Sequence, residues 1–231
     1  GTAGSTGLVL QTLVMPLALA SEPSRLVLEG GTHNMLAPPF EFVAQSFLPI
    51  LNRMGPRVDA QLVRHGFYPR GGGRIEIDIT PAPLTPIECL DRGTLRERSA
   101  TALVAGLPYE IGKREIDAAR KALAWPEEGF AVRQLSESQG PGNILLIEAV
   151  FDHVTEIVSG FGKLGVPAES LAKKAAGRIY NVGGGPKSTL SLRELLAWIA
   201  ERSGRALPVT WGPWRPGDQK VYVSDVRLAA R

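Results

Sequence analysis

The feature that most constrains the fold is residues 30–34, Gly-Gly-Thr-His-Asn, which follow an apolar segment at residues 25–29. The apolar segment predicts a β-strand, and the two glycines after it let the backbone approach another segment or a ligand closely. The next three residues place short hydrogen-bonding side chains on the loop where the strand ends. We therefore expect a binding site at this loop.

Hydrophobic periodicity in residues 1–91 predicts the order α-β-α-β-β. Pro16 predicts a kink or an early end of the first helix, and Gly55 with Pro56 predicts the end of the second. The first helix is apolar around most of its circumference, so we expect it to be buried. The predicted helices are residues 8–20 and 40–54, and the predicted strands are residues 25–29, 58–64 and 74–79.

A second unit is expected after a proline-rich linker at residues 81–86. It spans residues 92–176 and has the predicted order β-α-β-β-α. The elements are strands 99–105, 131–136 and 143–151, a helix at 114–125, and a second helix from about residue 167. From residue 177 the pattern changes to a strand that ends in three glycines and a helix capped by Ser or Thr.

Composition restricts the class of protein only weakly. The formal charge of +3 and the pI near 9.2 permit a polyanionic partner without requiring one. Cys89 is the single cysteine, which excludes an intrachain disulfide and favours a reducing compartment, the cytoplasm. Residues 7–20 look like the apolar part of a signal peptide, but no basic residue precedes them and they are too short to span a bilayer. We expect no membrane association.

Several strings together resemble the RNA 3'-terminal phosphate cyclase family. They are GTAGS at 1–5, LVLQT at 8–12, LEGGTHN at 28–34, APPF at 37–40 and GFYPRGGG at 66–73. The resemblance extends to about residue 176, and residues 177–231 resemble the C-terminal part of nucleotide-sugar epimerases of the extended short-chain dehydrogenase/reductase family. The expected fold class is α+β: part of the cyclase large domain at 1–91, the inserted small domain at 92–176, and a short epimerase-like α/β fragment at 177–231.

The resemblance implies an enzyme that uses ATP and Mg²⁺ to convert an RNA 3'-terminal phosphate into a 2',3'-cyclic phosphate. It implies nucleotide contacts from Gln11, Thr32 and Asn34, and an apolar wall against adenine from Pro39 and Phe40. Each residue has a simpler alternative. Gln11 can be a polar residue on an exposed helix face, Asn34 a local cap, and Phe40 a core residue behind a helix-starting proline.

Arg64 and Arg70 flank the glycine-rich segment at residues 71–73 and are candidates for contacts with RNA phosphates. The alternative is a pair of solvated arginines beside a hairpin. In the tail, Arg215 matches by resemblance an arginine that contacts the phosphates of a sugar nucleotide.

The family's catalytic apparatus is expected to be incomplete in this chain. None of His33, His65 and His153 lies in the context of the nucleotidyl histidine, which belongs to a C-terminal segment absent here, and none has a partner at metal-ligand spacing. The N-terminal acidic and arginine-bearing strand is also absent. We therefore expect a truncated or chimeric chain with impaired activity, and exposed helix faces and a sheet edge that favour self-association.

Two other functions stay open. The first is a fragment of an NAD-dependent nucleotide-sugar epimerase, because residues 1–7 fit G-x-x-G-x-x-G and Tyr109 with Lys113 fits Y-x-x-x-K. However, no strand precedes the glycines, and Pro108 and Gly112 predict an interrupted helix at the Tyr-Lys pair. The second is a non-catalytic RNA-binding remnant.

Overall fold

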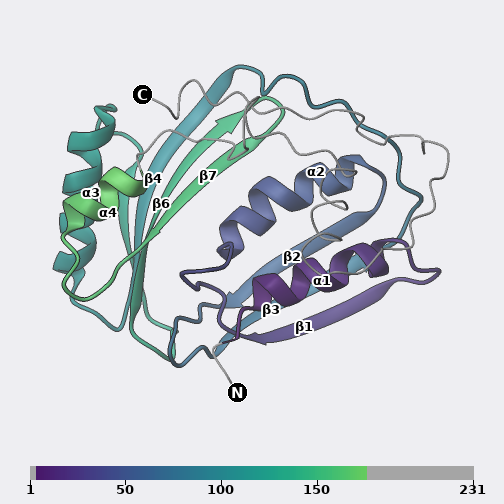
Figure 1. Cartoon of the computed structure of the whole chain (residues 1–231), viewed down its shortest axis with the longest axis horizontal. Helices are drawn as coiled ribbons and strands as arrows, with labels where there is room; N and C mark the ends of the chain where they lie inside the picture. The colour runs from purple at the N-terminus through teal and green to yellow at the C-terminus, as the bar shows by residue number, and fades with distance from the viewer. Residues whose placement is uncertain (1–3, 176–231) are drawn as a thin grey trace, which may run out of the picture. The chain divides into compact units, whose positions relative to one another are not determined.

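The computed structural model describes residues 4–175, which all belong to the first of two compact units of the chain, residues 1–177. They contain two separate sheets, each with helices on one face (Figure 1). The predicted domain boundary between residues 91 and 92 stays a prediction. No helix of the described residues combines the length and the hydropathy needed to cross a membrane.

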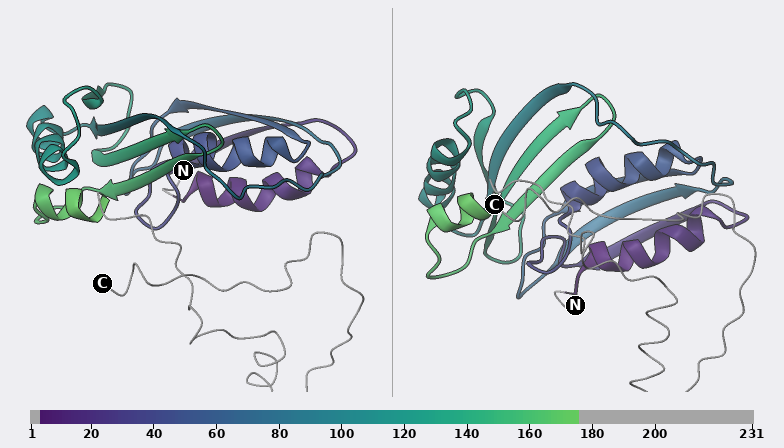
Figure 2. Two further views of the ribbon diagram at one scale, coloured as in Figure 1. Left: turned by 90° about the horizontal axis from the view of Figure 1, so that it is seen from above. Right: turned by 45° about the horizontal axis from the view of Figure 1, so that its top comes forward.

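The first sheet is antiparallel, with strand order β1-β3-β2. Its helices α1 and α2 lie on the same face of the sheet, as both views of Figure 2 show. This part of the chain runs helix, strand, helix, strand, strand, as the hydrophobic pattern predicts. The elements are α1 Thr6–Ala18, β1 Ser24–Gly30, η1 Phe42–Phe47, α2 Leu48–Arg53, β2 Arg57–Arg64 and β3 Gly73–Thr80.

The alternation of β3 explains how this sheet packs. Ile75, Ile77 and Ile79 are buried against the helices, because successive side chains of a strand point to opposite faces. On the other face, Arg74 forms ion pairs with Glu29 of β1 (3.0 Å) and Glu76 (2.8 Å). The buried core of this sheet consists of Leu10, Val14, Val43, Leu48, Leu51, Val58, Ile75, Ile77 and Ile79.

Two expectations for the helices of this part need correction. The helix predicted at residues 40–54 is a π-helical turn, η1, followed by α2, with the backbone N–H of Leu48 bonded to the carbonyl of Val43. The prediction that the first helix is buried holds for one face only. Apolar side chains elsewhere on α1 are exposed: Leu8, Val9 and Met15, as is Leu19, which caps its C-terminal end. Whether these apolar side chains or a sheet edge cause self-association stays a prediction.

The second sheet has the order β5-β4-β6-β7, with β4 parallel to β5 and the other pairs antiparallel. Helices α3 and α4 lie beside each other on one face (Figure 1). The elements are β4 Leu95–Ala105, α3 Tyr109–Leu123, β5 Phe130–Leu135, β6 Gly142–Phe151, β7 Thr155–Phe161 and α4 Ala168–Ala175.

The predicted order β-α-β-β-α for this unit is wrong, because it omits β7. The strand follows β6 through a tight turn in which the Phe151 N–H donates to the Val154 carbonyl (2.9 Å). Nearly every position of β7 is half-buried, so its sequence shows no clear alternation of apolar and polar residues. Pairing with β6, rather than local pattern, determines this strand.

The prediction that Pro108 and Gly112 interrupt a helix is also wrong. Pro108 precedes the first residue of α3, where a proline is tolerated, and Gly112 lies inside the helix. A Cβ on Gly112 would lie 2.7 Å from side-chain carbons of Val104 and Val132. The glycine is therefore needed for α3 to pack closely on β4 and β5.

Candidate functional site

The candidate site is built from the two strand-end loops, residues 30–34 after β1 and residues 65–73 between β2 and β3. Both β1 and β2 are antiparallel to β3, so they run in the same direction, and their C-terminal ends lie at the same end of the sheet. The N–H groups of Thr32 and His33 both donate to the Gly66 carbonyl, at 2.9 and 3.0 Å. The Gly66 N–H in turn donates to Thr32 Oγ1 at 2.9 Å. The two loops therefore form one hydrogen-bonded structure.

Glycine at position 66 is required by this close packing. A Cβ on Gly66 would lie 2.3 Å from the Gly73 nitrogen and 2.4 Å from the Gly30 oxygen. Both atoms belong to backbone, which cannot move aside as a flexible side chain can. The sequence motifs at residues 28–34 and 66–73 are thus complementary parts of a single packing arrangement.

The N-terminal end of α1 is hydrogen-bonded to the same loops. The Thr6 backbone N–H (2.9 Å) and hydroxyl (3.0 Å) both donate to the Gly31 carbonyl. A Cβ on Gly7 would lie 3.0 Å from the Pro38 carbonyl oxygen. Gln11 is half-buried and lies one helical turn after Gly7, hence on the side of α1 that faces this segment.

The other predicted nucleotide contacts lie at or near the strand-end loops. Thr32 is buried, and its hydroxyl is engaged by His33 and Gly66. Asn34 is half-buried at the end of the first loop. Pro39 is buried, and Phe40 packs against the core of the first sheet.

The two predicted RNA-binding arginines differ in their surroundings. Arg64 is half-buried, and its Nε donates to the Gly72 carbonyl at 2.6 Å, so it supports the second loop. Arg70 is exposed, with a long contact of 3.4 Å from Nη1 to the Gln139 carbonyl. Arg215 lies outside the described residues.

A His-Glu pair lies at the centre of the loops. The buried His33 side chain has its Nδ1 2.7 Å from Thr32 Oγ1 and its Nε2 2.9 Å from Glu41 Oε2. Its ring stacks on His65 and on Phe67, with ring centroids 5.1 and 5.2 Å apart. These contacts fix the position and the orientation of the imidazole.

The surroundings favour a charged Glu41 and a neutral His65. Burial opposes ionisation of Glu41, but the hydrogen bond and the charge of His33 together hold its pKa below the ordinary value. Burial, and then repulsion from His33, lower the pKa of His65 to about 4. At neutral pH the His65 ring therefore carries a free lone pair.

The spacing of the histidines in the sequence predicted no metal-ligand partner, and the structure brings two of them together with a glutamate. His33, Glu41 and His65 each offer a ligand atom, and these atoms lie within 4.8 Å of one another. The residues are far apart in sequence and match no short metal-binding motif. The available signal was that two predicted strands are each followed within a few residues by a histidine.

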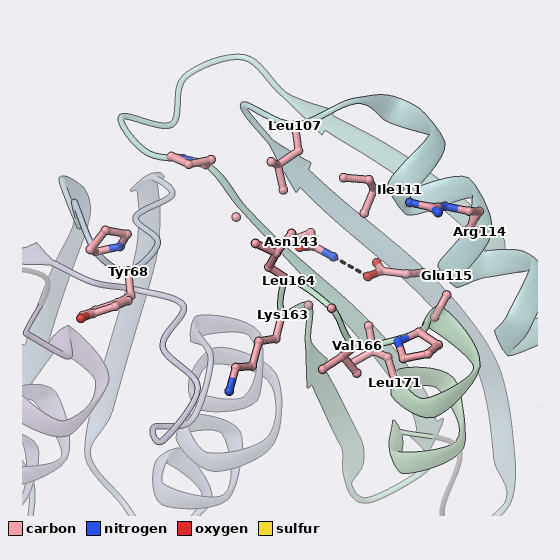
Figure 3. Close-up of a pocket in the computed structure, with 17 residues that line it drawn as sticks. Tyr68, Leu107, Ile111, Arg114, Glu115, Asn143, Lys163, Leu164, Val166 and Leu171 are labelled. Carbon is pink, nitrogen blue, oxygen red and sulfur yellow. Dashed lines mark hydrogen bonds between the residues drawn. The ribbon is translucent and has the colours of Figure 1, made fainter.

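A second candidate site is a cavity of about 660 Å³, shown in Figure 3. Glu115 of α3 and Asn143 of β6 lie at its centre, joined by a hydrogen bond in which Asn143 Nδ2 donates. Glu115 is only 3% exposed, and its Oε2 has no hydrogen-bond partner among the described residues. Burial raises the pKa of Glu115 to about 7, although Asn143 and the charge of Arg114 oppose the shift.

Sequence reasoning missed this cavity. Glu115 lies in an amphipathic helix with charged residues on both sides of it, a pattern typical of a solvent-exposed glutamate. Its burial follows from the contact of α3 with the second sheet. The other labelled residues around it are Tyr68, Leu107, Ile111, Arg114, Lys163, Leu164, Val166 and Leu171.

The fold and the first site define an α+β protein whose candidate binding residues lie on loops at one end of a three-stranded sheet. The family model "RNA 3'-terminal phosphate cyclase" matches residues 1–206, and the chain belongs to this family. The match extends beyond residue 176, where we expected the resemblance to end. The expected resemblance of residues 177–231 to epimerases has no support.

Two relatives with the family's name agree with this assignment. The chain is 49% identical over 177 residues to the RNA 3'-terminal phosphate cyclase of Koribacter versatilis (strain Ellin345), which covers 76% of this chain and 50% of the relative. It is 46% identical over 175 residues to the protein of the same name from Ectopseudomonas mendocina (strain ymp), covering 76% and 51%. The chain thus spans about half the length of the curated relatives it matches.

Proposed function

We propose that this chain provides nucleotide- and RNA-binding elements for the ATP-dependent conversion of an RNA 3'-terminal phosphate into a 2',3'-cyclic phosphate. The observation that carries the proposal is the family match over residues 1–206, which includes α1 and both strand-end loops. In this reaction AMP passes from an enzyme histidine to the RNA phosphate, and the neighbouring 2'-hydroxyl then displaces AMP. ATP and Mg²⁺ are the proposed cofactors, because a divalent cation neutralises the charge that develops during the transfer.

The proposed nucleotide contacts come from α1 and from the segment after the first loop. Gln11 offers both an amide donor and an acceptor on the side of the helix that faces this segment. Asn34 offers the same groups at the end of the loop. The half-buried Phe40 is the proposed apolar contact for a base, and the buried Pro39 beside it would have to become exposed to take part. Thr32 contributes indirectly, because its hydroxyl holds the two loops together.

Glutamine at position 11 gives the sharpest test of nucleotide binding. We expect the Gln11→Ala variant to bind ATP about tenfold more weakly in isothermal titration with Mg²⁺, since a hydrogen bond to a ligand contributes about 1–1.5 kcal/mol. The matched control is Gln61→Ala, which removes an exposed glutamine from β2. Equal affinities of the Gln11→Ala variant and the unaltered chain would refute the role of Gln11. Failure of the unaltered chain to bind ATP would refute the nucleotide site.

Formation of a covalent AMP adduct on a histidine is tested separately from nucleotide binding. None of the chain's three histidines lies in the expected context of the nucleotidyl histidine. We therefore expect the 231-residue chain, incubated with labelled ATP and Mg²⁺, to bind nucleotide without forming a covalent AMP adduct. A labelled protein band after denaturing electrophoresis would overturn this expectation of impaired activity.

A further inference from the structure

We propose that His33, Glu41 and His65 form a binding site for a divalent metal ion of the zinc type. One ligand atom from each of the three side chains lies within 4.8 Å of the other two. The residues come from the loop after β1, the start of the helical segment at η1, and the loop after β2. The proposal does not rest on the Mg²⁺ proposed to accompany ATP or on the proposed function.

The distance between the His33 and Glu41 ligand atoms is close to that of two ligands on one metal ion. Bonds of about 2.0–2.2 Å in a tetrahedral zinc site place neighbouring ligand atoms about 3.3 Å apart. The distance from His33 Nε2 to Glu41 Oε2 is now 2.9 Å, so the pair must open by only a few tenths of an ångström. His65 stacks on His33 with an interplanar angle of 23°. Its ligand nitrogen lies within 4.8 Å of the other two ligand atoms, so it must move closer to complete the site.

The hydrogen bonds around His33 suit a metal ligand. When Nε2 bonds to a metal, Nδ1 must carry the ring proton and donate it to a neighbour. Thr32 Oγ1 lies 2.7 Å from Nδ1 and can accept this bond, while its own hydrogen turns toward the Gly66 carbonyl at 3.5 Å. The contacts of Thr32 therefore supply an acceptor for the Nδ1 proton when Nε2 binds a metal ion.

The ligand set determines the kind of metal. Two imidazoles and one carboxylate suit Zn²⁺ and neighbouring first-row ions, whereas Mg²⁺ and Ca²⁺ prefer oxygen ligands. The Glu41 side chain is 13% exposed, so solvent reaches it. A tetrahedral ion with three protein ligands would take water or another small ligand in the fourth position. Among charged neighbours, Glu148 is near enough to influence Glu41, and Arg133 to influence His65.

The test is a titration of the untagged chain with Zn²⁺ and with Co²⁺ as a spectroscopic probe. We expect one equivalent of Co²⁺ to give the visible absorption of a four-coordinate ion, and Zn²⁺ to displace it. The variant His65→Phe keeps a ring that can stack on His33 but offers no ligand atom. Its affinity for Zn²⁺ should fall at least about tenfold, as should that of Glu41→Gln. The matched control His153→Phe changes an exposed histidine outside the cluster and should bind as the unaltered chain does.

The outcomes separate loss of a ligand from loss of the fold. Circular dichroism reports whether each variant is folded, and the unaltered chain allows a measurement that needs no variant. In its NMR spectrum, Co²⁺ should shift the ring resonances of His33 and His65 and leave those of His153 in place. Unchanged affinity in folded His65→Phe and Glu41→Gln variants, or equal shifts of all three histidines, would overturn the proposal. So would the absence of Co²⁺ absorption in the unaltered chain.

Discussion

The surroundings of Glu115 make the free energy of unfolding of the chain depend on pH. Its carboxyl group is buried beside the cavity of Figure 3, and among residues 4–175 only one of its oxygens is hydrogen-bonded, to Asn143. Burial favours the neutral form and raises the pKa to about 7, from an ordinary value of 4.5. Since the folded state binds this proton more tightly than the unfolded state, the proton contributes to stability.

The pH dependence follows from the sign of this shift. The contribution of Glu115 is fully present below pH 4.5, falls as the pH rises toward 7, and is absent above it. The variant Glu115→Gln stays neutral, so at pH 8 its free energy of unfolding should exceed that of the unaltered chain by up to about 3 kcal/mol. At pH 4 the two proteins should be equally stable. Urea unfolding at both pH values measures the difference, with Glu110→Gln, an exposed residue of the same helix, as control. A difference that does not change with pH would contradict the assignment.

Arg70 is the residue for which we predict a contribution to RNA binding. Its guanidinium is exposed beside the second strand-end loop and makes one long hydrogen bond within the described part of the chain. If it contacts a phosphate, Arg70→Ala should weaken binding of a 3'-phosphorylated RNA and reduce the slope of log affinity against log salt by about 1. Fluorescence anisotropy at several salt concentrations measures both. Arg57→Ala, at the opposite end of β2, should leave the slope unchanged. Equal slopes for the unaltered chain and Arg70→Ala would exclude the contact.

At the scale of elements, the sequence predicted the segments with clear periodicity and missed those that depend on neighbours. The strand predicted at residues 74–79 is β3 with one residue more at each end, because its alternation is complete. Strand β7 has no such alternation and was not predicted. The candidate site shows the same difference. The existence of a loop at residues 30–34 was predicted from its own residues. The cluster of His33, Glu41 and His65 was not, because it depends on the strand order β1-β3-β2.

The residue that caps the C-terminal end of helix α3 should affect the stability of the chain. Ala124 caps the helix with φ of 50°, a left-handed conformation that costs a residue with a Cβ roughly 1–2 kcal/mol. Glycine avoids this cost but loses more entropy on folding, so Ala124→Gly should raise the free energy of unfolding by about 0.5–1 kcal/mol. The matched control Ala122→Gly, inside the same helix, should lower it by about 1 kcal/mol. Thermal or urea unfolding distinguishes the two signs, and destabilisation by both variants would contradict the role of Ala124.

At the scale of the described unit, Phe67 joins the two sheets. It belongs to the loop between β2 and β3, yet its side chain is buried in a cluster with residues of β4 and β6. Its ring also stacks on the ring of His33. The members of this cluster are Phe67, Leu103, Ala105, Ile144 and Leu146. One aromatic side chain thus contacts both the candidate metal site and the core of the second sheet.

This position predicts a large effect on the whole unit. Phe67→Ala should lower the free energy of unfolding by about 3–5 kcal/mol, as expected for a buried aromatic residue. Phe67 contacts residues of both sheets, so its loss should destabilise both. The urea concentration at which each sheet unfolds should fall, and the two sheets should still unfold together. The control Phe151→Ala, which removes a partly buried ring at the end of β6, should have a smaller effect. Unchanged stability of either sheet in Phe67→Ala would contradict this coupling.

The central position of β3 has a consequence for how sequences of this family can change in length. Both histidine-bearing loops are aligned through β3, which pairs with β1 on one side and β2 on the other. One residue gained or lost within β3 would invert its buried and exposed sides and shift the two loops relative to each other. Natural insertions and deletions should therefore be absent from residues 73–80 and be tolerated in the irregular segment 81–94, which carries no strand pairing.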